Sequence, residues 1–290
     1  MSIDVEYGPE FVKRAAADLL AVRPSYGELI GFYGDLFAAQ EEARPRVRVE
    51  PFLLPPDLLR VKLRDKFPLT QVAEMRFDPE ASATLFEDLC RIAVERRSGL
   101  SEPAAVLLKH AAKVVSLFQG FLGGEEAQLK QAADGFGVGP EALSFFLYHS
   151  LRPSLCRCEQ DLSGFITDAL SWEKGYCPIC GSPPALARLE TDGHRFLFCS
   201  FCWHRWPARR TVCPFCDTVD PGRLSYQYSE EEKEYRLDLC DACRKYVKTV
   251  DSRQMSRLSY PPLEQIASLH LDIKAAEAGY ETGSPATPPV

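Results

Sequence analysis

The sequence predicts an α+β protein: an α-helical N-terminal domain, then two tandem β modules built around cysteines, then a C-terminal helix. In the first part, apolar residues recur at helical spacing. After Trp172, β-branched and aromatic residues alternate between clustered cysteines. A helical pattern returns behind Pro261-Pro262. We therefore expect a helical domain at 1–172, metal-binding ribbons at 173–251, and a C-terminal helix with a flexible tail at 252–290.

The helical part shows no alternation of strand and helix patterns, which favours a bundle. Its expected helices cover 9–21, 25–40, 79–97, 102–121, 125–133, 141–151 and 154–170, with an extended, proline-containing connection at 45–56. The final helix is expected from Pro261 to about Ala278. From Glu281 the chain carries Pro, Gly, Ser and Thr, which is typical of a flexible end.

The overall charge argues against some classes of partner. The 290-residue chain carries a net charge of −7, so it is not drawn as a whole to nucleic acid or anionic lipid. The first residues have neither the basic nor the apolar region of a secretory signal, and the longest apolar run, at 143–148, is too short to cross a bilayer. We therefore expect a cytoplasmic protein whose thiols are kept reduced.

Eight of the 11 cysteines form four Cys-x-x-Cys pairs. The pairs are Cys177/Cys180, Cys199/Cys202, Cys213/Cys216 and Cys240/Cys243. Two cysteines at this spacing turn both sulfurs toward one ion at about 2.3 Å, and a second pair completes a tetrahedron. Because clustered cysteines in a reducing compartment bind metal more often than they form disulfides, two four-thiolate sites are predicted. Such sites are most often structural, since two short hairpins bury little apolar surface.

An internal repeat indicates how the pairs combine. Each copy consists of a cysteine knuckle, a strand, a turn, a strand and a second knuckle. Asp192-Gly193 is typical of a hairpin turn. The expected strands are 185–190, 195–198, 223–228 and 233–239. Zinc-ribbon spacing also favours pairing within each copy. The predicted sites are therefore Cys177, Cys180, Cys199 and Cys202, and Cys213, Cys216, Cys240 and Cys243. Pro178 and Pro214 preset φ in their knuckles, and Gly181 and Asp217 follow where a positive φ is needed.

The remaining candidate residues give weaker signals. The aromatic segment 203–206 is expected to pack over the metal hairpin, with a partner-docking patch as the alternative. His194 and His204 are possible ligands, although sulfur already fills all eight positions. Cys90 is expected in the core. Cys156 and Cys158 lie two apart in a predicted helix, so they face different sides and cannot chelate one ion.

The charge of the ribbons and their thiolate ligands narrow the range of functions that the sequence allows. Residues 173–251 hold 12 basic and 12 acidic side chains, and each divalent ion on four thiolates adds −2. The ribbons therefore lack the basic footprint of a nucleic-acid binder. Cys-Pro-Ile-Cys-Gly at 177–181 is similar to a rubredoxin knuckle, in which iron takes the same four thiolates, so an electron carrier is an alternative. Without a glycine-rich phosphate loop or an open three-ligand metal site, we expect no enzymatic activity.

Several segments together resemble a known family. They are Cys-Pro-Ile-Cys-Gly-Ser-Pro-Pro at 177–184, Leu-Phe-Cys-Ser-Phe-Cys-Trp at 197–203, Cys-Pro-Phe-Cys at 213–216, Leu-Asp-Leu-Cys-Asp-Ala-Cys-Arg-Lys-Tyr-Val-Lys-Thr-Val-Asp at 237–251, and 271–280, ending Ala-Glu-Ala-Gly-Tyr. This pattern is similar to the formate dehydrogenase accessory (formation) protein family, FdhE; Cys156-Arg-Cys158 is not part of it.

The resemblance implies a cytoplasmic, non-catalytic protein needed to make active formate dehydrogenase. It implies contact with the catalytic subunit of that enzyme, and two rubredoxin-like iron ions, or two zinc ions, at the eight matched cysteines. The alternatives left by the residues themselves are a rubredoxin-like electron carrier and a zinc-ribbon module that binds protein or nucleic acid.

Overall fold

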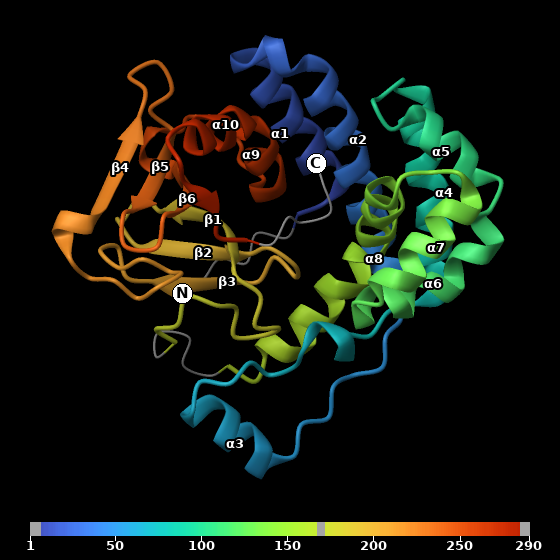
Figure 1. Cartoon of the computed structure of the whole chain (residues 1–290), viewed down its shortest axis with the longest axis horizontal. Helices are drawn as coiled ribbons and strands as arrows, with labels where there is room; N and C mark the ends of the chain where they lie inside the picture. Colours follow the sequence, from blue (N-terminus) through green and yellow to red (C-terminus); the bar gives the residue numbers. More distant parts are fainter. Residues whose placement is uncertain (1–6, 167–171, 285–290) are drawn as a thin grey trace.

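The computed structural model describes residues 7–166 and 172–284 and confirms the α+β class. Most helices of the N-terminal part lie on one side and the β-sheet on the other, whereas the helix Pro56–Arg64 lies apart, below the sheet in this view (Figure 1). The helices are α1 (Pro9–Val22), α2 (Gly27–Ala43), α3 (Pro56–Arg64), α4 (Pro79–Glu95), α5 (Ser101–Leu108), α6 (Ala111–Gly123), α7 (Glu126–Phe136) and α8 (Pro140–Ser163).

Three features of this helical part differ from the sequence prediction. The helix expected over 102–121 is two helices, α5 and α6, which meet at a bend of 107°. The helices expected at 141–151 and 154–170 are one helix, α8, which carries Pro153 inside it and ends at Ser163; 167–171 lie outside the described residues. Helix α3 was not predicted at all, and none of its residues is buried.

The structure also bears on membrane insertion. Among the described residues, no single helix has the length and apolarity needed to cross a bilayer; α5 and α6 pass that test only when taken together, across their sharp bend.

Both ribbons belong to a single sheet. Its strands are β1 (Pro184–Leu189), β2 (Arg195–Cys199), β3 (Arg205–Ala208), β4 (Leu224–Tyr228), β5 (Tyr235–Cys240), β6 (Lys245–Asp251) and β7 (Glu281–Thr282). The order β3-β2-β1-β6-β5-β4 places the three strands of the first ribbon beside the three of the second, and β7 also pairs with β6. The ribbons join through a parallel pairing of β1 with β6, in which Leu186 lies opposite Lys248. The four predicted hairpin strands are present, whereas β3, β6 and β7 were not predicted.

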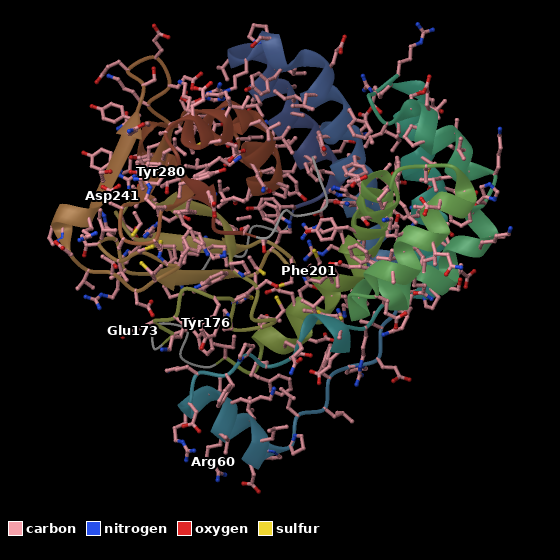
Figure 2. All side chains as sticks on the ribbon, viewed as in Figure 1. Arg60, Glu173, Tyr176, Phe201, Asp241 and Tyr280 are labelled. Atoms are coloured by element: carbon pink, nitrogen blue, oxygen red, sulfur yellow. The ribbon has the colours of Figure 1, made fainter. Side chains whose placement is uncertain are left out.

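The C-terminal segment is more ordered than its composition indicated. The predicted final helix is two short helices, α9 (Pro261–Ala267) and α10 (Leu269–Glu277). Part of the expected flexible tail, Glu281–Thr282, forms β7. The Tyr280 hydroxyl, just before β7, donates to Asp241 at 2.6 Å, and Figure 2 shows the two side chains together at the second ribbon.

Helix α9 connects the helical part to the sheet. On one side the Tyr260 hydroxyl, at the start of α9, donates to Glu41 of α2 at 2.9 Å. On the other side, Glu264 of α9 accepts a hydrogen bond from the Tyr235 hydroxyl of β5. Arg257 pairs with both oxygens of Glu264, at 2.7 and 2.8 Å. Buried side chains from the helices, the sheet and α9 consequently form one continuous apolar core.

Candidate metal centre

Each Cys-x-x-Cys pair closes a tight knuckle of the same shape. The residue that follows each pair has a positive φ: Gly181 (78°), Trp203 (62°), Asp217 (57°) and Arg244 (57°). In three of the knuckles the backbone N–H of this residue donates to the carbonyl of the first cysteine, at 2.8 to 3.0 Å. The prediction of a positive φ at Gly181 and Asp217 is confirmed. Trp203 and Arg244 are less favourable residue types for this conformation, so sequence reasoning missed them.

The first cluster consists of Cys177, Cys180, Cys199 and Cys202, whose sulfurs all lie within 4.8 Å of one another. The Sγ–Sγ distances are 3.4 Å between Cys180 and Cys199, 3.6 Å between Cys177 and Cys202, and 3.7 Å between Cys180 and Cys202. A tetrahedron with metal–sulfur bonds of about 2.3 Å has edges of about 3.8 Å. Disulfide sulfurs lie only about 2.05 Å apart, so these distances fit a metal site and not a disulfide.

The second cluster consists of Cys213, Cys216, Cys240 and Cys243, again with all sulfurs within 4.8 Å. Its Sγ–Sγ distances are 3.7 Å between Cys213 and Cys243 and 3.6 Å between Cys216 and Cys240. All eight cysteines are free of disulfides. The structure thus groups the sulfurs copy by copy, in the pairing that the internal repeat predicted.

Backbone N–H groups point at the sulfurs of both clusters. In the first cluster, Ile179 donates to Cys177 at 3.4 Å and Phe201 donates to Cys199 at 3.3 Å. In the second, Phe215 donates to Cys213 at 3.4 Å. Hydrogen bonds of this kind favour the negatively charged thiolate, which is the form that binds metal.

The two clusters differ in burial. All four cysteines of the first cluster are buried, and none is more than 6% exposed. In the second cluster Cys213 and Cys240 are buried, Cys243 is half-buried and Cys216 is exposed. A metal ion in the first cluster would therefore lie in the protein core, whereas one in the second would lie at the surface.

The thiol pKa values follow this difference. Burial raises the pKa of Cys177 and Cys202 well above the usual value, so in the absence of a cation these thiols hold their protons. Burial acts in the same direction on Cys216, but hydrogen bonds from Thr218 and from neighbouring thiols outweigh it and lower the pKa to about 7. A bound metal ion would displace the protons in both clusters.

The first cluster is held by two segments of the N-terminal part, the irregular chain after α3 and helix α8, as well as by its own ribbon. The backbone N–H groups of Leu69 and Thr70, which follow α3, donate to the carbonyls of Pro178 and Ile179, both at 2.9 Å. On the other side, the Tyr148 hydroxyl of α8 donates to the carbonyl of Phe201 at 3.0 Å. Figure 2 shows Phe201 at the boundary between the sheet and α8.

The weaker candidates lie outside both clusters. His194 pairs with Asp192 at 3.0 Å, and His204 pairs with Glu159 at 2.7 Å. Cys90 is buried in the core, as predicted. Within α8, Cys158 is buried and donates to the carbonyl of Arg76 at 3.1 Å, whereas Cys156 is half-buried.

The aromatic segment packs against the ribbon. Trp206 is 1% exposed, and its indole N–H donates to the carbonyl of Lys174 at 3.1 Å. Trp203 lies beneath the Arg152 guanidinium, 5.3 Å from the ring centre. Packing against the ribbon is therefore found for Trp206, whereas Trp203 faces Arg152 of α8.

The fold and the two cysteine clusters define a class of protein: a helical domain joined to a double ribbon with two four-sulfur groups that could hold two metal ions. A family model described as "FdhE, central domain" matches residues 176–210. The chain is 35% identical over 148 residues to a "Protein FdhE homolog" of Aquifex aeolicus, covering 50% of this chain and 51% of that one. "Protein FdhE" of Escherichia coli is 29% identical over 116 residues, covering 39% and 37%.

The similarity in fold covers more of the chain than the similarity in sequence does. The crystal structure of the FdhE protein from Pseudomonas aeruginosa superposes with a TM-score of 0.66 at 21% identity, covering 97% of this chain and 96% of that one. The chain therefore shares the fold of that FdhE protein along nearly its whole length, and residues 176–210 match the central domain of the FdhE family. In sequence it spans about half the length of the Aquifex relative that it matches, and less of the Escherichia coli one.

Proposed function

We propose that this protein is a non-catalytic accessory factor for the maturation of formate dehydrogenase, and that it binds the catalytic subunit of that enzyme. The observation that carries the proposal is the pair of four-cysteine clusters on the FdhE fold. Sulfur fills all four positions of each cluster, which leaves no open position for a substrate on the metal. A metal ion held in this way shapes a surface or carries an electron.

We propose the eight clustered cysteines as the ligands of two metal ions, either iron or zinc. Both ions accept four thiolates in a tetrahedron. Metal analysis of anaerobically purified protein, together with a visible spectrum, distinguishes the two. Iron on four thiolates absorbs visible light, and the absorption is bleached on reduction, whereas the zinc form is colourless.

The partner is tested by anaerobic co-purification of the tagged chain with the catalytic subunit of formate dehydrogenase. We expect the wild type to retain the subunit and Cys213→Ser to retain less. Cys156→Ala is the matched control, because this cysteine lies outside both clusters. Failure of the wild type to retain the subunit, under conditions in which its metal content is full, would count against the proposal.

A second candidate function, electron transfer, is favoured by one observation. Cys216 is exposed, so a redox partner can approach the second cluster closely. An electron carrier would contain iron, would be bleached reversibly on reduction and would reduce a partner enzyme. A colourless zinc protein rules this function out and leaves the maturation proposal intact.

A further inference from the structure

We propose that the cavity between the two ribbons binds a phosphate-bearing small molecule, with the phosphate facing a group of arginines and an apolar part lying against aromatic side chains. The cavity has a volume of about 470 Å³ and is lined by residues of β2, β4, β5, β6 and the segment 210–221. It adjoins a second cavity of about 280 Å³, with which it shares the lining residues Arg195, Val212, Cys213, Pro214 and Val219. Nothing in this proposal depends on the proposed function.

The cavity collects positive charge in a chain whose net charge is −7. Its lining contains Arg195, Arg210, Arg236 and Lys245, but only one carboxylate, Asp238. The lining of the adjoining cavity adds three more basic side chains and two acidic ones. One of the acidic side chains is Glu173, which Figure 2 places at the lower edge of the ribbons. An excess of guanidinium groups around a cavity is the usual way in which proteins hold a phosphate.

The arginines that line the cavity outnumber the carboxylates with which they can pair. The Asp238 carboxylate is shared between Arg195, at 3.1 Å, and Arg236, at 2.8 Å. Arg195 is only 4% exposed, and its Nε has no hydrogen-bond partner among the described residues. Arg210 is exposed and has no ion pair or hydrogen bond within the described part of the chain. A buried N–H without a partner is uncommon in folded proteins, so Arg195 points to a ligand that supplies an acceptor.

The other walls of the cavity are apolar and aromatic. They include Phe215, Leu224, Tyr226 and Leu239. Tyr226 is 59% exposed, and the guanidinium of Arg236 lies 4.9 Å from its ring centre. An aromatic face beside a guanidinium is suited to a planar ring that carries a phosphate. A bare inorganic anion would use the arginines and leave this apolar wall without a partner.

The competing explanation is that the cations balance the charge of the second cluster. Cys213 and Cys240 both line the cavity, and a divalent ion on four thiolates carries a net −2. In that case the cavity would bind no added anion. The two explanations therefore predict opposite results in a binding experiment on the metal-loaded protein.

The experiment is calorimetric titration of the full-length, metal-loaded protein with ADP, followed by competition with inorganic pyrophosphate. We expect saturable binding of ADP below about 1 mM, displacement by pyrophosphate, and no binding of adenosine. Because Arg210 is exposed and unpaired, Arg210→Gln should leave the fold and metal content unchanged and weaken binding by about tenfold. Lys245→Gln, on β6, provides a second variant in the lining of the cavity.

Arg91→Gln is the matched control, because this exposed arginine lies on α4, away from the ribbons. It should bind ADP as the wild type does. Absence of ADP binding, equal binding by Arg210→Gln and the wild type, or equal affinity for ADP and pyrophosphate would each overturn the proposal. Metal analysis of the same samples ensures that a loss of binding is not a loss of the second cluster.

Discussion

The unequal burial of the two clusters predicts that their metal ions leave at different rates. A chelator added to the metal-loaded wild type should remove the ion of the second cluster first, because Cys216 is exposed and Cys243 is half-buried. The cysteines of the first cluster are at most 6% exposed, so the surrounding structure must open before a chelator reaches them. The experiment adds a chelator in excess over the bound metal and contains no reductant or oxidant.

The hydrogen bonds that hold the first cluster set the size of the difference. Leu69, Thr70 and Tyr148 each donate a hydrogen bond to a knuckle of this cluster. A hydrogen bond contributes about 0.5–1.5 kcal/mol net, so breaking three costs about 1.5–4.5 kcal/mol. At about 1.4 kcal/mol for each factor of ten, we expect release from the first cluster to be roughly one to three orders of magnitude slower.

The assay is a time course of metal release under anaerobic conditions, followed with a chromogenic chelator. The wild type should show two phases of equal amplitude. Cys216→Ser should lack the fast phase and keep the slow one, whereas the control Cys156→Ala should keep both. A single phase in the wild type, or loss of the slow phase in Cys216→Ser, would refute the argument from burial.

Three further predictions concern stability and are measured by denaturant unfolding of the metal-loaded protein. Glu264 is 1% exposed and is the closer of the two carboxylates that pair with the largely buried Arg257; the other, Glu234, lies 3.7 Å away. Glu264→Gln should therefore destabilise the fold by about 3 kcal/mol, and a loss below about 1 kcal/mol would contradict this. Burial and the charge of Arg152 lower the pKa of His149 to about 3. The unfolded chain takes up this proton near pH 6.5 and the folded chain does not, so the free energy of unfolding falls as the pH drops from 6.5 toward 3. Between pH 7 and 5.5 the wild type should lose about 1 kcal/mol more than His149→Gln, and equal losses would exclude His149 as the cause. Tyr148→Phe removes the hydroxyl that binds the first cluster's knuckle and should cost about 1 kcal/mol while accelerating the slow phase of metal release.

The site could be predicted from the sequence because its geometry is local. Two cysteines three positions apart fix the shape of a knuckle, and in two of the four knuckles a residue suited to positive φ, Gly181 or Asp217, follows directly. The pairing of knuckles followed from the repeat, since Cys180 and Cys199 are joined by a single hairpin. The cavity between the ribbons was not predicted, because its cations come from β2, the linker between the ribbons, β5 and β6. Within the sequence, the neighbouring Arg209 and Arg210 are the local sign of its positive charge.

The fold was predicted less completely, for reasons that depend on distant residues. Strand β6 is buried at six of its seven positions, so it lacks the alternation that marks a half-exposed strand. Its partner β1 lies about 60 residues earlier in the chain. A local sequence pattern cannot predict a parallel pairing between strands so far apart. Likewise, the sequence analysis expected separate helices at 141–151 and 154–170, but α8 continues through Pro153 because its packing in the core outweighs the lost hydrogen bond.

The same parallel pairing explains why the two clusters are not equivalent, although they arise from a repeat. Joining β1 to β6 places the two ribbons edge to edge in one sheet, so their clusters lie against different parts of the protein. Helix α8 and the segment after α3 both bind knuckles of the first ribbon, which places its cluster in the core. The second ribbon has β4 at the sheet edge, and the exposed side chains of β4 leave that end of the sheet open to solvent. Loss of metal from the first cluster should therefore loosen contacts in the helical part, whereas loss from the second should be confined to its own ribbon and the cavity beside it.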